Sequence, residues 1–172
     1  MNGKRMSLIG GVVVFLLVAG TTGALAHRIY QGWTAMWEND GRCVKLKATV
    51  DHGSYGKGFF GAEVSTVKRS LDLINCRDTW TRPRDNLRVK YIVYRGFNLN
   101  ICLNPGYYQN QVDTAYIAMK LNQPNSPPCG SGNYAVKARG STLFNGSWTT
   151  DNNGLITNQW HYLPDYASSP PF

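Results

Sequence analysis

The chain has 172 residues and carries 18 Lys and Arg against ten Asp and Glu, a formal net charge of +8. This length suits one domain with a modest core and leaves no evident second domain. Leu is scarce, whereas Gly, Asn, Tyr and Thr are common, and no long segment has a 3.6-residue apolar period. The composition therefore favours strands and turns and argues against a helical bundle.

Residues 1–26 have the pattern of a secretory signal peptide. Lys4 and Arg5 precede a short apolar run, and small residues lie before a cleavage point after Ala26. The run is shorter than the roughly 20 apolar residues that span a bilayer. We therefore expect cleavage after Ala26, a secreted mature protein and no stable membrane span after cleavage. A retained membrane anchor is the alternative.

The segment 27–41 precedes the first clear strand and is rich in aromatic side chains. Its candidate contact residues are Ile29, Tyr30, Trp33, Met36 and Trp37. A helical turn would show three of them on one face, whereas an extended chain would present them at a sheet edge. Aromatic and Met side chains are enriched in interface cores. We predict a partner-binding arm over 27–41, which docks by strand addition or into a groove; the alternative is that it covers the protein's own domain.

Several segments alternate apolar and polar residues with period two, as half-buried strands do. They span 43–50, 58–68, 87–94, 97–103, 113–121 and 133–139, and Phe144, Gly146 and Trp148 continue the last of them. In 97–103 the expected inward set is Phe97, Leu99, Ile101 and Leu103. Turn-forming runs such as Asp40-Gly41 separate the strands. We predict an all-β, single-domain antiparallel β-sandwich over 42–162, Ig-like in outline, and a Pro-containing tail over 163–172.

The four cysteines all follow the leader, so export would bring them into an oxidising compartment. They are Cys43, Cys76, Cys102 and Cys129. Three pairings are possible, and we favour Cys43–Cys76 with Cys102–Cys129. Alternation puts Cys43 and Cys102 off the apolar faces of their strands, so the bridges should tie strands to covering loops. We expect no metal site, because there is no Cys-x-x-Cys pair and the histidines are scattered.

The sequence contains no recognisable catalytic constellation. Its histidines are His27, His52 and His161, and the run Asp51-His52-Gly53-Ser54 consists mostly of turn formers. A catalytic triad is defined by geometry in space and not by adjacency along the chain. The motifs of serine hydrolases, zinc proteases and phosphate loops are also absent. We predict a non-catalytic protein without a cofactor; an enzyme with an unrecognised site is the third possibility.

Basic residues are concentrated in 42–95, which holds twelve Lys and Arg against five acidic residues. The candidate patch for an anionic partner comprises Arg77, Arg82, Arg84, Arg88, Lys90 and Arg95, with Trp80, Tyr91 and Tyr94 interleaved. A solvated basic face is the alternative. Candidate partners outside a cell are wall polymers, lipid headgroups or acidic proteins. No motif supports specific nucleic-acid binding.

A second group of aromatic residues suggests glycan binding. Trp148, Trp160 and Tyr162, together with Tyr107 and Tyr108, could stack on sugar rings. The alternation in 133–148 favours a core position for Trp148. We therefore rank another secreted protein as the first candidate partner, and a cell-wall glycan or anionic polymer as the second.

In size, leader and strand-rich pattern over residues 1–162, the chain resembles small, cysteine-stapled β proteins secreted by Gram-positive bacteria. Among these it is similar to the adaptor subunit of umbrella toxin particles. The resemblance implies a role in linking a toxin-bearing chain to lectin-like subunits, with the segment before Cys43 as the linking element. It carries over no functional residue.

Overall fold

A computed structural model describes residues 29–52, 58–69, 76–123, 127–149, 154–157 and 160–163. The predicted leader and its cleavage site lie outside these ranges. Every regular element in the described residues is a β-strand. A search of the same residues finds no helix that is long and apolar enough to cross a membrane.

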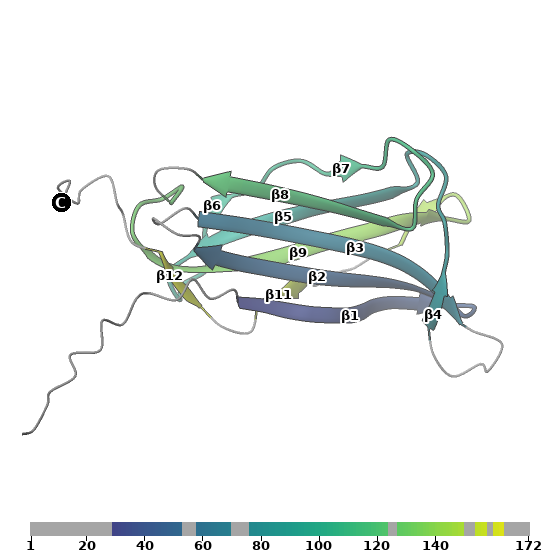
Figure 1. Cartoon of the computed structure of the whole chain (residues 1–172), viewed down its shortest axis with the longest axis horizontal. Coiled ribbons are helices and arrows are strands. Elements are labelled where there is room, and N and C mark those ends of the chain that lie inside the picture. Colours follow the sequence, from purple (N-terminus) through teal and green to yellow (C-terminus); the bar gives the residue numbers. More distant parts are fainter. Residues whose placement is uncertain are drawn as a thin grey trace, which may run out of the picture.

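The first sheet has five antiparallel strands. They are β1 (Ile29–Asn39), β2 (Arg42–His52), β3 (Gly58–Arg69), β4 (Cys76–Thr79) and β8 (Tyr116–Gln123). The strand order is β1-β2-β3-β4, and β8 also pairs with β3. In Figure 1 this sheet lies in front, with β1, β2, β3 and β8 running nearly side by side.

The second sheet has seven strands and lies behind the first in Figure 1. They are β5 (Leu87–Arg95), β6 (Asn100–Leu103), β7 (Tyr108–Gln109), β9 (Gly132–Phe144), β10 (Ser147–Trp148), β11 (Leu155–Ile156) and β12 (His161–Leu163). The strands β5 and β9 form its centre, while β6 and β7 pair with β5 and the three short strands β10, β11 and β12 pair with β9.

The core lies between the two sheets and follows the predicted alternation. Leu46 and Val64 from the first sheet, and Val89 and Val136 from the second, are fully buried in it. The sheets approach closely at Gly140, where a Cβ atom would lie 2.6 Å from Cδ2 of Leu46. The predicted all-β sandwich is therefore confirmed.

Two hairpins have two-residue turns with positive φ at both positions, as type I′ turns require. Asp40 and Gly41 have φ of 49° and 68°, and they join β1 to β2. Asn145 and Gly146 have φ of 49° and 76°, and they reverse the chain between β9 and β10. The prediction that Phe144 to Trp148 continues one strand was therefore wrong, because Asn-Gly supplies a turn at that point.

The predicted strand 97–103 was also partly wrong. Residues 96–99 form a turn, and only Asn100–Leu103 is a strand. A register shift between Val93 and Tyr94 interrupts the alternation opposite this strand. Ile101 is consequently exposed, whereas Cys102 and Leu103 both pack against the core.

The structure moves both predicted ends of the sandwich. Residues 29–39 are not a separate arm, because β1 pairs with β2 from Ile29 to Asn39. Leu163, placed in the tail by the sequence, lies in β12 and is fully buried. The strands of the β-sandwich therefore begin at Ile29 and end at Leu163 within the described residues; the rest of the predicted tail lies outside them.

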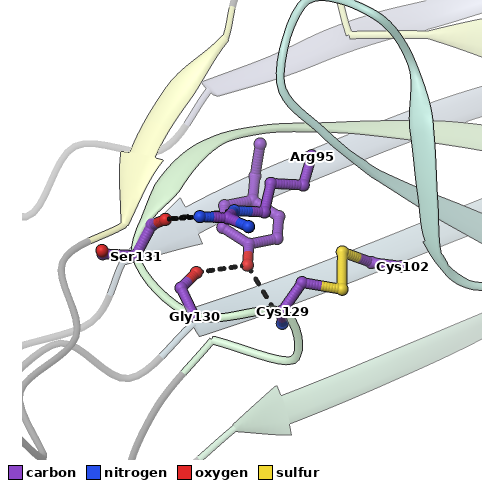
Figure 2. Close-up of a disulfide and its surroundings, with 6 residues drawn as sticks. Arg95, Cys102, Cys129, Gly130 and Ser131 are labelled. Carbon is purple, nitrogen blue, oxygen red and sulfur yellow. Dashed lines mark hydrogen bonds between the residues drawn. A yellow bond between two sulfur atoms is a disulfide. The ribbon is translucent and has the colours of Figure 1, made fainter.

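The two disulfides have the predicted pairing. Cys43 in β2 is bonded to Cys76 in β4, so this bridge ties two strands of one sheet. The prediction that Cys43 lies off the apolar face is confirmed, although β4 leaves it fully buried. Cys102 in β6 is bonded to Cys129 in the loop before β9 (Figure 2). The prediction for Cys102 was wrong, because the register shift turns it toward the core.

Candidate binding surface

The predicted arm residues divide between the core and the surface. Met36 and Trp37 are half-buried and pack against the core, and the Trp37 ring meets that of Phe144 with centroids 5.4 Å apart. Trp33 is 43% exposed on the outer face of the first sheet. Nothing is described of the side chains of Ile29 and Tyr30. Of the predicted contact residues with described side chains, Trp33 alone is available to a partner.

Trp33 lies beside a small polar network on this outer face. Its ring meets Tyr116 edge to face at 6.1 Å. The Tyr116 hydroxyl donates a hydrogen bond of 2.8 Å to Glu63, which also pairs with Lys47 at 3.2 Å. Partial burial, the hydrogen bond and the negative charge of Glu63 together raise the pKa of Tyr116 to about 12.

The structure does not bring the six residues of the predicted basic patch together, and Arg82 has a structural role. Its guanidinium lies 4.2 Å from the Trp80 ring centroid and donates hydrogen bonds to Thr142 and the Leu143 carbonyl. Burial lowers the pKa of Arg82, and the positive charge of Arg42 lowers it further. Arg82 therefore ties the loop between β4 and β5 to β9.

Three other members of the patch lie far apart in the fold. Arg77 is exposed on β4, at the edge of the first sheet. Arg84 is in a loop and pairs with Asp85 at 3.5 Å. Arg95 ends β5 and donates two hydrogen bonds to the Ser131 carbonyl, as Figure 2 shows. Tyr91, which the sequence interleaves with the patch, faces the core.

The remaining two members, Arg88 and Lys90, form a new group with residues that the sequence prediction missed. In the register of β5 and β9, Lys90 lies directly opposite Arg139, and Lys137 is two residues away on the same face. We call Arg88, Lys90, Lys137 and Arg139 the basic quartet. Among the described residues, no Asp or Glu occupies an outward-facing position of β5 or β9. The alternation of 133–139 was the available signal, but the pairing of the two strands was not readable from the sequence.

Two aromatic rings and one hydrogen bond hold the quartet's Arg88 in place. Its guanidinium lies 4.0 Å from the Trp148 ring centroid and 4.3 Å from that of Tyr107. Its Nε donates a 2.7 Å hydrogen bond to the hydroxyl of Ser141. Trp148 is thus half-buried on the outer face, and the prediction of a core position was wrong.

Apolar side chains are exposed at the opposite end of the second sheet, where β5 turns into β6. Phe97 is 71% exposed, Ile101 60% and Leu99 47%. The Phe97 ring meets Trp160 at 5.2 Å, and Tyr162 nearby on β12 is 57% exposed. We call Phe97, Leu99, Ile101, Trp160 and Tyr162 the hairpin cluster. Of the predicted sugar-stacking residues, Trp160 and Tyr162 belong to this cluster, whereas Trp148 and Tyr107 contact Arg88 of the basic quartet. Tyr108 lies in β7, opposite Val89.

A hollow of about 330 Å³ adjoins the hairpin cluster. Ile101, the Cys102–Cys129 disulfide, Asn133 and Arg95 line it. Tyr134 fixes the wall behind it, since its hydroxyl donates to the Gly130 carbonyl at 2.6 Å and accepts from the Cys129 amide at 3.1 Å. Figure 2 shows this loop held against β9 and Arg95. The hollow therefore has a rigid apolar wall and one cationic rim residue.

The described residues offer one cluster with metal-ligand atoms, formed by Glu38, Cys43 and Cys76. Its two sulfur atoms are joined in a disulfide, so they cannot act as the thiolates that bind zinc. The side chains of His52 and His161, and all of His27, lie outside the described residues. Asp51 is buried at the end of β2.

Comparison with known proteins gives no match to this chain, whether among protein-family models, curated proteins or solved structures.

Proposed function

We propose that this protein is a secreted, non-catalytic binding module whose partner is another extracellular protein. The hairpin cluster carries this proposal, because contiguous apolar side chains exposed on a folded domain are typical of interaction sites. Aromatic residues such as Phe97, Trp160 and Tyr162 are enriched in such sites relative to the rest of a protein surface. The leader pattern of residues 1–26 supports an extracellular partner.

Leu99 provides the strongest argument for a role outside the chain. It has φ of 56°, in the left-handed region that Gly and Asn tolerate and that strains other side chains. Nearly half of its surface is exposed, so core packing does not compensate for the strain. Strained residues of this kind tend to occur where the side chain has a function. A contact with a partner would account for Leu at this position.

The hollow beside the cluster suggests how a partner side chain is held. Ile101 and the Cys102–Cys129 disulfide offer an apolar wall, and Arg95 places a guanidinium at the rim. On the partner, an apolar side chain would fit against this wall, and an acidic side chain next to it would pair with Arg95. Anchors of this kind, buried in a pocket of the other protein, provide most of the binding energy in many complexes.

The proposal modifies the role that the resemblance to the umbrella-particle adaptor implies. A linking function remains in keeping with a module that binds proteins. The contact would lie at the hairpin cluster, however, since Met36 and Trp37 of the segment before Cys43 are committed to the core. Trp33 could add a second contact on the opposite sheet.

Affinity capture from the native culture medium, followed by mass spectrometry, tests this proposal. We expect the unmodified protein to capture one partner in a fixed ratio, and Phe97→Ser with Ile101→Ser to lose it. Val112→Ser is the matched control, because Val112 is equally exposed but lies near the start of β5, at the other end of the sandwich. Retention of the partner by the double variant, or capture of wall fragments in its place, would contradict the proposal.

A further inference from the structure

We propose that this protein forms a dimer in which β8 of one copy pairs with β8 of a second copy. The two strands would run antiparallel about a two-fold axis at Met119, so that the first sheets of both copies become one continuous sheet. The dimer surface is separate from the hairpin cluster, and it does not depend on the protein partner proposed above.

β8 is the one long and regular edge among the described strands. It has eight residues, pairs with β3 alone and keeps one register with it throughout, and Figure 1 shows it at the border of the first sheet. At the opposite border, β1 has two irregularities in its register with β2. β4 has four residues and a register shift, and the outer strands of the second sheet have two to four residues. Short or irregular edges hinder pairing with another chain, whereas a long regular edge offers it a row of backbone groups.

The pairing of β8 with β3 determines which of its backbone groups point outward. In an antiparallel pair, successive residues direct their N–H and C=O groups alternately toward the neighbouring strand and away from it. The carbonyl of Ala115 points to β3, from which it accepts a 2.8 Å backbone hydrogen bond, so the groups of Tyr116, Ala118 and Lys120 point outward. The groups of Tyr116 bond to the hydroxyl of Thr114. Since no described strand pairs with this side of β8, those of Ala118 and Lys120 can pair with a second copy.

The side chains of β8 complement those of its own copy. With the axis at Met119, Ala118 lies opposite Lys120 of the second copy, and each such pair exchanges two backbone hydrogen bonds. On the core side, Ile117 lies opposite Leu121 of the second copy, and the two Met119 side chains meet. No two charges face each other in this register. An axis at Lys120 would instead place two lysines opposite each other, which opposes pairing.

The core side of β8 is incompletely covered in the single chain. Met119 and Leu121 pack against the core but are half-buried, whereas Leu46 and Val64, farther inside the same sheet, are fully buried. In the dimer, the core-side residues of the second copy would cover them. Burial of apolar surface is the main favourable contribution to most protein association. A second copy therefore supplies both the backbone partners and the apolar residues that match this edge.

Sedimentation equilibrium of the secreted protein at increasing concentration tests the dimer. We expect the mass to rise from that of one chain to that of two. Ala118→Pro should raise the dissociation constant at least about tenfold, because two outward N–H donors are lost, one in each copy. Proline is tolerated on an edge strand where the N–H would point outward, so the hydrogen bonds to β3 remain. Thermal melting of the dilute protein checks that each variant is folded.

Ala118→Lys tests the register of the two strands without changing a backbone group. It places a lysine opposite Lys120 of the second copy, twice in the dimer, and should raise the dissociation constant about tenfold. Within one copy the new lysine lies opposite Glu63 on β3, so it does not oppose folding. Adding Lys120→Glu should restore the dimer, since opposite charges then face each other across the axis.

The matched control is Gln111→Lys, which adds the same charge at an exposed position outside β8. We expect it to change the dissociation constant by less than about twofold. Phe97→Ser with Ile101→Ser should leave the dimer intact, which separates this surface from the protein site. Four results would overturn the proposal: the mass of one chain at every concentration up to about 1 mM, a dimer unchanged by Ala118→Pro, loss of the dimer in the hairpin-cluster variant, or no restoration by Lys120→Glu.

Discussion

At the scale of single residues, the outer surfaces hold side chains whose properties depend on one or two neighbours. Leu99 keeps a strained backbone while its side chain faces solvent. Arg88 is held by two rings and one hydroxyl. Tyr116 is held by Glu63 and covered in part by Trp33. Such local arrangements are open to direct tests by substitution.

Tyr116 should ionise two pH units above an ordinary tyrosine. Its pKa is raised to about 12, from about 10 in an unfolded chain. The resulting stabilisation is complete below about pH 10 and is lost as the pH rises through about 12. The difference in phenolate absorbance between the protein and Tyr116→Phe measures this group. Glu63→Gln should lower the pKa of Tyr116 without restoring the ordinary value, because burial remains; an unchanged pKa would show that Glu63 has no effect.

At the scale of elements, β1 is part of the domain and not a free arm. Trp37→Ala should destabilise the fold by about 3 kcal/mol, because the ring packs against Phe144 and the core. Trp33→Ala is the control on the same strand, and its exposed ring should contribute less than about 1 kcal/mol. Urea unfolding measures both. Equal small losses would mean that β1 adds little to the core.

The sequence predicted those strands in which apolar residues lie on one face and polar residues on the other. Over 44–48 in β2 and 136–140 in β9 the alternation matches the observed burial, because one face meets the core and the other is partly open to water. It failed over 97–103, where Phe97 and Leu99 lie in a turn and, like Ile101, are exposed. The exposed apolar residues of the hairpin cluster thus imitated the alternation of a core strand.

The candidate sites were less predictable than the strands, because each depends on which strands become neighbours. Arg88 and Lys90 are close in sequence to Arg82 and Arg84, yet they share a face with Lys137 and Arg139, about 50 residues away. The density of basic residues along the chain therefore grouped Arg88 and Lys90 with the wrong basic residues. Register between distant strands is a property of the folded sheet and has no local signal.

At the scale of the whole molecule, the packing of the two sheets depends on Gly140. A Cβ atom there would lie 2.6 Å from Leu46 and 3.0 Å from Val64. Gly140→Ala should therefore destabilise the protein by about 1–3 kcal/mol through overpacking. Gly106→Ala is the control, because no atom lies within 4 Å of its added Cβ. A stability loss equal to that of the control would mean that the sheets have room to separate.

The whole molecule has a rigid two-sheet core with different surfaces on the second sheet: apolar at the β5–β6 turn and basic over β5 and β9. Leu99→Asn tests most directly whether the β5–β6 turn binds a protein partner. Asn tolerates the left-handed conformation, so the melting temperature should stay the same or rise, while capture of the partner should be lost. A variant that melts at a lower temperature, or one that still captures the partner, would contradict the account.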